Sequence, residues 1–192
     1  KNWRWRTTTK PFPYLVNLEL KDEVVFEYLS NIYNTVLFKD IISRFKIRNV
    51  HFLESLVSFL ADNVGSLVSA NKISGFLKSQ KIKISPNVVI NYLSFLSRAF
   101  LIYKTDRFDV QGKKVFEVNQ KYYFEDLGLR NSIVGFKAVD INKVIENIVF
   151  LHLKIWGYKV FVGQMKDKEI DFVCQKDNET VYVQAAYRIN EE

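Results

Sequence analysis

The spacing of apolar residues changes its period along this chain, and that change restricts the fold more than any other feature. Between Asp22 and Phe100, several segments place apolar residues every three or four positions, as on one face of a helix. Leu101 to Phe108 and Lys114 to Phe124 instead have the pattern of two strands joined by a turn. With 192 residues, 48% of them apolar, the chain can bury a substantial core. The sequence therefore predicts an α+β fold.

Capping residues place the helices within the first part of the chain. A helix is expected over residues 22–44, and a second one begins after Asn49. A short helix at residues 69–77 comes next, and Ser85 with Pro86 opens a longer one, as a capping serine and a proline at the first helical position. Two helices followed by a two-stranded hairpin form the order of a winged helix.

The basic charge of the chain is concentrated in this same region. The net charge is +7, yet no acidic residue occurs between Asp62 and Asp106. Such a block can attract a polyanion through the release of counterions, although a solvated basic face without a partner is the simpler alternative. The candidate nucleic-acid-binding residues are Lys72, Lys78, Lys81, Lys83, Asn87, Asn91, Arg98, Lys104, Lys113 and Lys114.

The helix that follows Ser85 is the candidate reader of the major groove. Its spacing puts Asn87, Asn91, Ser94 and Arg98 on one polar face. A recognition helix usually carries more basic side chains than this single arginine. Nonspecific contact with phosphates through the lysines, or docking of a protein, are therefore alternatives to the reading of a sequence.

A second constellation lies near the C-terminus. A helix over residues 142–155 carries Glu146, and strand alternation places Asp171 and Gln184 where they can converge with it. Two carboxylates and an amide oxygen are suitable ligands for Mg²⁺. A cation that would polarise the attacking water is missing from the set. The alternative is that Glu146 and Asp171 are structural acids of the core.

Other features bound the biology of the chain. Cys174 is its single cysteine, which excludes an internal disulfide and favours a reducing cytoplasm. No apolar run is long enough to span a bilayer, so no membrane partner is expected. No glycine-rich phosphate loop occurs, so ATP is not expected to bind to this chain. Residues 1–20, with two prolines close together, are expected to form an extended arm.

Taken in order, five segments resemble a domain of unknown function found after the ATPase core of bacterial and archaeal AAA-type ATPases. These segments are Tyr33 to Arg44, Lys121 to Arg130, Glu146 to Phe150, Gly157-Tyr158 and Glu169 to Val173. The resemblance covers about nine-tenths of the chain.

The resemblance implies a helical bundle with a winged-helix unit over residues 21–135 and a PD-(D/E)XK nuclease-like region over residues 136–192. The nuclease acids then fall on Glu146 and Asp171, and the Glu/Gln of the motif on Gln184. The lysine position of the motif falls on Ala186, which argues against cleavage. The nuclease-like fold normally continues past this point, so the chain is interpreted as a fragment with a truncated second part.

The expected function is that of a noncatalytic accessory region of an AAA-type ATPase, binding nucleic acid or a protein partner. ATP would then bind to the missing N-terminal domain of the parent protein. Two alternatives stay open. One is a Mg²⁺-dependent nuclease that uses Glu146, Asp171 and Gln184, and the other is a pure protein-interaction platform.

Overall fold

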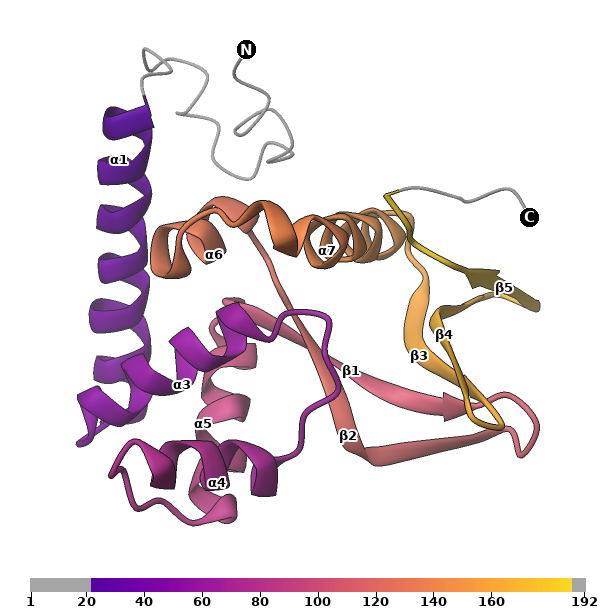
Figure 1. Cartoon of the computed structure of the whole chain (residues 1–192), viewed down its shortest axis with the longest axis horizontal. Coiled ribbons are helices and arrows are strands. Elements are labelled where there is room, and N and C mark those ends of the chain that lie inside the picture. The colour runs from indigo at the N-terminus through magenta and orange to yellow at the C-terminus, as the bar shows by residue number, and fades with distance from the viewer. Residues whose placement is uncertain (1–21, 188–192) are drawn as a thin grey trace.

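The computed structural model describes residues 22–187, so the arm predicted over residues 1–20 lies outside the described part. Within it, a group of helices lies beside a twisted mixed sheet, which confirms the α+β class (Figure 1).

The described part of the chain begins with one long helical segment. This segment consists of α1 (Asp22–Asn34), a stretch of π-helix, η2 (Thr35–Ile42), and the short α2 (Ser43–Phe45). The next helix, α3 (Val50–Asp62), begins where Asn49 accepts a hydrogen bond from a backbone N–H of its first turn. Both helices agree with the sequence prediction.

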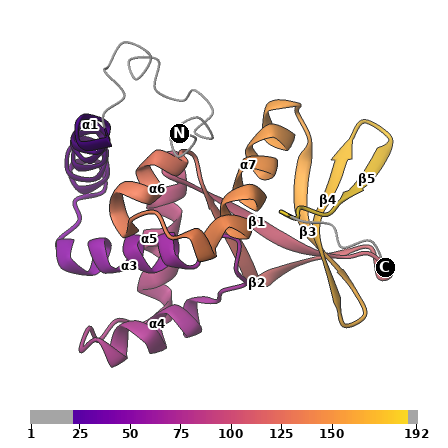
Figure 2. The same ribbon diagram turned by 45° about the horizontal axis from the view of Figure 1, so that its top comes forward.

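Two capped helices follow in the predicted order. The side chain of Ser69 caps α4 (Ala70–Ser79), and that of Ser85 caps α5 (Pro86–Arg98), which has its proline in the first turn. Figure 2 shows α3, α4 and α5 gathered on the same side of the sheet.

A long hairpin connects the helical half to the sheet. Its strands are β1 (Ile102–Asp109) and β2 (Lys114–Phe124), paired antiparallel with an irregularity at the middle of β2. At that irregularity Gln120 pairs with Val68, which lies just before α4. The hairpin is thereby attached to the segment between α3 and α4.

The rest of the chain covers and extends this sheet. It contains α6 (Leu127–Val134), the short η3 (Ala138–Asp140) and α7 (Ile141–Ile155), which packs on the strands. The side chain of Asp126 caps α6, and that of Asn147 binds the backbone N–H and carbonyl of Phe124 at 2.8 and 2.9 Å. These two hydrogen bonds fix α7 to the end of β2.

The three C-terminal strands join the hairpin in one sheet. They are β3 (Lys159–Met165), β4 (Lys168–Lys176) and β5 (Glu179–Val183), in the order β2-β1-β3-β4-β5. Because β1 pairs with β3 in parallel, the sheet crosses the boundary predicted at residues 135 and 136. The last strand, β5, ends at Val183.

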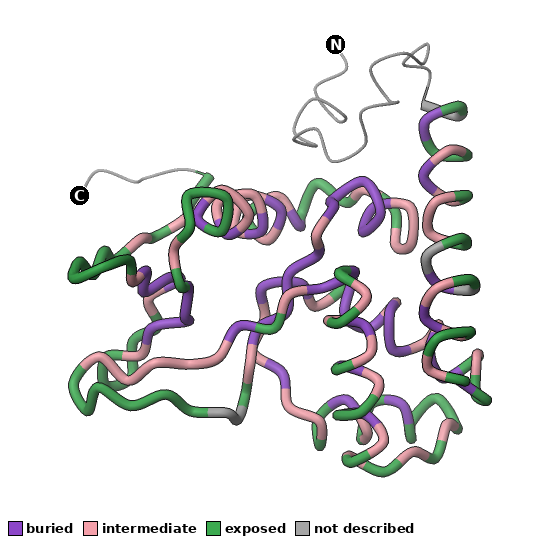
Figure 3. The backbone as a smooth tube through the Cα atoms, turned by 180° about the vertical axis from the view of Figure 1, so that it is seen from behind, coloured by how far each residue is buried: buried purple, intermediate pink, exposed green. Residues whose placement is uncertain are grey.

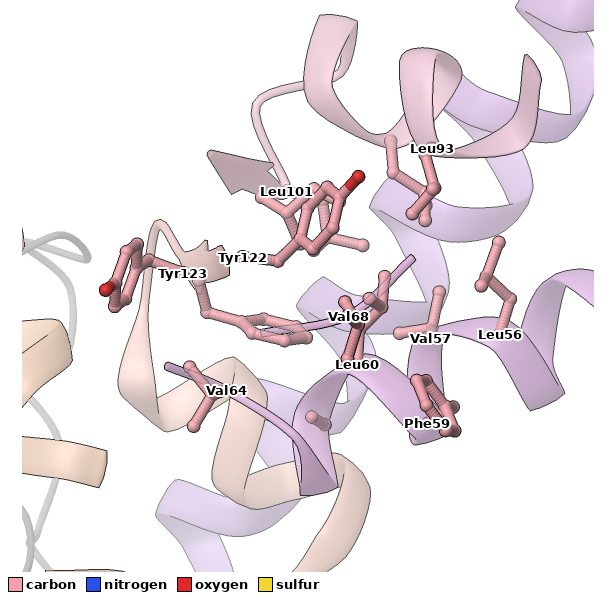
Figure 4. Close-up of a cluster of buried hydrophobic side chains, with 14 of the residues drawn as sticks. Leu56, Val57, Phe59, Leu60, Val64, Val68, Leu93, Leu101, Tyr122 and Tyr123 are labelled. Carbon is pink, nitrogen blue, oxygen red and sulfur yellow. The ribbon is translucent and has the colours of Figure 1, made fainter. Parts of the chain in front are cut away.

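The principal core lies between the helices and the hairpin. Figure 4 shows leucines and valines of α3 packed toward Val68, Leu93 and Leu101, with Tyr122 and Tyr123 of β2 at its edge. In the view from behind, the buried segments lie at the centre of the molecule, whereas the hairpin tip is exposed (Figure 3). Among residues 22–187, no helix is long and apolar enough to cross a membrane.

Candidate functional site

The two constellations predicted from the sequence lie on opposite sides of β2. The first is a cleft of about 720 Å³ between α5, the start of α4 and the base of the hairpin, where β1 begins and β2 ends. Pro86 and Arg98 both line it, so it follows the whole of α5, about 18 Å at 1.5 Å per residue. We call it the α5 cleft.

The α5 cleft has a neutral to basic lining. Its polar groups are carboxamides, hydroxyls and the cationic side chains of Arg98 and Lys104, and none of the described residues that line it is acidic. Arg98 lies with its guanidinium 5.1 Å from the centre of the Phe45 ring. Lys104 forms an ion pair of 3.2 Å with Asp106, in which both side chains are accessible to solvent. Such an exposed pair contributes little to stability and leaves Lys104 able to contact an anion.

The ten predicted nucleic-acid-binding residues are all exposed, but they do not form one patch. Asn87, Arg98 and Lys104 line the α5 cleft. Asn91 is exposed one turn along α5 from Asn87, and Lys72 lies in the first turn of α4, next to Asn71 of the cleft lining. The others lie elsewhere: Lys78 in the last turn of α4, Lys81 and Lys83 in the following loop, and Lys113 and Lys114 at the hairpin tip.

The second site is an ion cluster around Glu146 of α7, which we call the Glu146 cluster. The Oε1 atom of Glu146 accepts hydrogen bonds from Lys121 Nζ at 2.9 Å and from Tyr123 Oη at 2.7 Å. The same ammonium group lies 2.6 Å from Oε1 of Glu169 on β4. The Lys121 side chain is only 3% exposed, so its charge is almost fully removed from water. The cluster therefore links β2, α7 and β4 through one buried cation.

The pKa shifts in the cluster follow from burial and from the paired charges. Burial raises the pKa of Glu146, and nearby Asp171 adds to this, while the Lys121 ammonium acts in the opposite direction. Burial alone would lower the pKa of Lys121, but the carboxylates of Glu146 and Glu169 raise it above its ordinary value. Lys121 is therefore a permanent cation at neutral pH.

A glycine makes room for the Glu146 carboxylate. Gly65 has a φ of +70°, and a β-carbon at this position would lie 3.1 Å from Oε1 of Glu146. Since both the backbone conformation and the space favour glycine, a side chain at position 65 would disturb the cluster.

Asp171 and Gln184, which were predicted to converge with Glu146, contact each other. The Oε1 atom of Gln184 accepts a hydrogen bond of 3.4 Å from the backbone N–H of Asp171. One Asp171 carboxylate oxygen in turn accepts a hydrogen bond of 2.8 Å from the backbone N–H of Ala185. Regular pairing with β4 stops at this contact, and β5 ends at Val183.

The structure adds to the predicted acid site a cation that the sequence reasoning missed. The lysine that contacts Glu146 is Lys121 of β2, and no group of three or more His, Cys, Asp or Glu within residues 22–187 could hold a metal ion. A sequence signal existed, because alternation in β2 puts Lys121 and Tyr123 on one face of the strand. Its partner Glu146 lies 25 positions further along the chain, so pattern alone did not connect them.

Neighbouring side chains of β2 serve the two sites separately. Figure 4 shows Tyr122 and Tyr123 pointing away from each other. Gln120 and Tyr122 line the α5 cleft, whereas Lys121 and Tyr123 bind Glu146. The strand is therefore the common wall of both sites.

The comparisons with known proteins identify a family. Residues 11–140 match the model of a family described as a domain of unknown function (DUF8612), and the chain belongs to this family. It is 41% identical over 181 residues to an uncharacterized protein of Haemophilus influenzae, covering 94% of this chain and 44% of that protein. It is 30% identical over 176 residues to the uncharacterized protein MJ1544 of Methanocaldococcus jannaschii, covering 90% of this chain and 38% of the relative.

The chain thus spans less than half of the length of these relatives. No solved structure matches it.

Proposed function

We propose that this chain is a noncatalytic accessory region of an AAA-type ATPase and that it binds nucleic acid through the α5 cleft. The α3, α4, α5 and hairpin unit is interpreted as a winged helix, which the pairing of Val68 with Gln120 supports by adding a short third strand. The region from α7 onward is interpreted as nuclease-like. The observation that carries the proposal is the lining of the cleft, which contains two cations and no acid among its described residues.

The dimensions of the cleft fit one extended chain. A volume of about 720 Å³ spread along α5 gives a cross-section of roughly 40 Å². An extended polypeptide in a packed sheet takes about 47 Å², the product of the two sheet spacings. One strand of a nucleic acid or one extended peptide would therefore fill it. The basic lining favours the polyanion, since each cation that neutralises a phosphate releases counterions.

Binding to a fluorescent duplex, measured by anisotropy across a salt series, tests this proposal. We expect a steep loss of affinity with salt, and we expect Lys104→Ala to reduce the salt slope by about 1. Lys154→Ala, which removes an exposed lysine from α7, is the matched control and should leave the slope unchanged. No binding at low salt would refute the proposal. Binding of a protein partner with affinity independent of salt would instead favour the interaction-platform alternative.

The Glu146 cluster supports the noncatalytic part of the proposal. The Glu146 carboxylate already binds the Lys121 ammonium at 2.9 Å. A divalent cation at Glu146 would have to displace this ammonium or share the carboxylate with it. The nuclease alternative, with Mg²⁺ at Glu146 and Asp171, requires DNA or RNA cleavage that EDTA and Asp171→Ala both abolish. Cleavage with those two properties would overturn the noncatalytic assignment.

The ATPase part of the proposal concerns the longer protein. It is supported by the resemblance of the sequence segments and by relatives more than twice as long as this chain. Purified full-length Haemophilus influenzae relative should hydrolyse ATP, with a rate that changes when duplex DNA is added. Failure to hydrolyse ATP under either condition would refute this part alone.

A further inference from the structure

At the rim of the α5 cleft, α5 carries three exposed side chains with complementary chemistry. Asn87, Ile90 and Asn91 follow each other at positions i, i+3 and i+4, so they are neighbours on the helix surface. All three are exposed, and Ile90 retains 54% of its accessible surface. Within residues 22–187, no hydrogen bond engages the side chain of Asn87 or Asn91. In the view from behind, α5 lies in front and presents its exposed turns (Figure 3).

Each of these side chains matches one feature of an A·T base pair. An asparagine can bind N6 and N7 of adenine with two hydrogen bonds, and an apolar group can contact the C5 methyl of thymine. An isoleucine between two asparagines thus presents apolar surface where a thymine methyl would lie.

The same face offers little to guanine. Guanine is usually read by a bidentate arginine or lysine. Arg98 is the one basic residue of α5, and it lies in the last turn, about 16 Å along the axis from Asn87. Its guanidinium also lies over the Phe45 ring. The centre of the face is therefore neutral.

We infer that α5 reads A·T base pairs in the major groove of B-form DNA, and this inference rests on the proposed function. The major groove of B-DNA is about 12 Å wide and admits an α-helix, whereas that of duplex RNA is too narrow for side chains to read. Asn87 and Ile90 also line the α5 cleft, so the bases would be read beside the strand that the cleft holds.

A preference for A·T could also arise in the minor groove. Narrow A-tract minor grooves attract basic side chains, and Lys113 and Lys114 lie exposed at the hairpin tip. Inosine·cytosine pairs separate the two sources, because they resemble G·C in the major groove and A·T in the minor groove. Major-groove reading by α5 requires the protein to treat these pairs as G·C.

The first experiment compares 20-base-pair duplexes rich in A·T, G·C or inosine·cytosine by anisotropy at one salt concentration. We expect the A·T duplex to bind on the order of a hundredfold more tightly than the other two, with about tenfold from each asparagine. Equal binding of the A·T and G·C duplexes, or tight binding of the inosine duplex, would overturn the inference and leave the proposed function intact. No binding to any duplex at low salt would refute both.

The second experiment assigns the preference to residues. Asn87→Ala and Asn91→Ala should each weaken the A·T duplex about tenfold and leave the G·C duplex and the salt slope unchanged. Replacing thymine by uracil removes the C5 methyl group, so it should weaken binding by the wild-type protein but not binding by the Ile90→Ala variant. Lys104→Ala is the control, since loss of a phosphate contact weakens all duplexes equally. If the asparagine variants lose affinity equally for the A·T and the G·C duplex, base reading by α5 is refuted.

Discussion

Replacing Lys121 by methionine tests whether the buried cation stabilises the fold. The change removes a charged hydrogen bond to Glu146, and bonds to charged groups contribute about 1.5–3 kcal/mol. Glu146 keeps the hydroxyl of Tyr123, and Glu169 is 39% exposed and can regain water. The loss should therefore stay below the 3–5 kcal/mol of a fully buried broken pair. We expect the free energy of unfolding to fall by about 2–3 kcal/mol at pH 7.

The pH dependence of that loss identifies its cause. Burial raises the pKa of Glu146 in the folded state, so the stability that this group provides is fully present at acid pH and is lost as the pH rises. Lys121→Met removes the ammonium that opposes the shift, so its cost should be largest at neutral pH. This cost should become smaller at pH values below about 4.3, the ordinary pKa of glutamate, because Glu146 is then neutral in both the folded and the unfolded state.

Urea denaturation followed by circular dichroism measures these values. The double variant Lys121→Met/Glu146→Gln removes both charges and keeps an acceptor for Tyr123, so it should recover to within about 1 kcal/mol of wild type. Lys154→Met, at an exposed position of α7, should change stability by less than about 0.5 kcal/mol. If Lys121→Met is no worse than this control, or if Glu146→Gln gives no recovery, the argument for a stabilising buried pair is refuted.

Three further outcomes are expected. Gly65→Ala should cost more than Gly157→Ala in a denaturation assay, because both have positive φ but only the first crowds Glu146, and equal costs would contradict this. Burial raises the pKa of Asp126 to about 6, so wild-type stability should fall as the pH rises from about 4 to 6. Asp126→Asn should flatten this dependence when the free energy of unfolding is measured across a pH series. Arg130→Met should cost about 3–5 kcal/mol or prevent folding, since it removes a fully buried ion pair, and a soluble variant of wild-type thermal stability would refute this.

Local patterns predicted most of the elements, because their causes are local. Asn49 and Ser85 each satisfy the first backbone N–H groups of a helix, so capping residues located two helices correctly. Apolar alternation located the strands for the same reason. The contact between Asp171 and Gln184 likewise follows from the pairing of adjacent strands.

The remaining features depend on contacts distant in sequence. The parallel pairing of β1 with β3 joins segments separated by three helical elements, and no periodicity within either strand encodes it. The early end of β5 depends on the Asp171 carboxylate binding the backbone of Ala185. The pairing of Lys121 with Glu146 has the same origin. Each requires two segments that become neighbours only in the folded chain.

The alternation of β2 connects the chemistry of the two sites. A shift of one residue in this strand would move Lys121 and Tyr123 into the α5 cleft and turn Gln120 and Tyr122 toward Glu146. Pairing of Gln120 with Val68 fixes the middle of the strand, and the two hydrogen bonds of Asn147 to the Phe124 backbone fix its end. The buried cation therefore serves the cleft indirectly, because Lys121 has a favourable environment only in the register that places Gln120 and Tyr122 in the cleft.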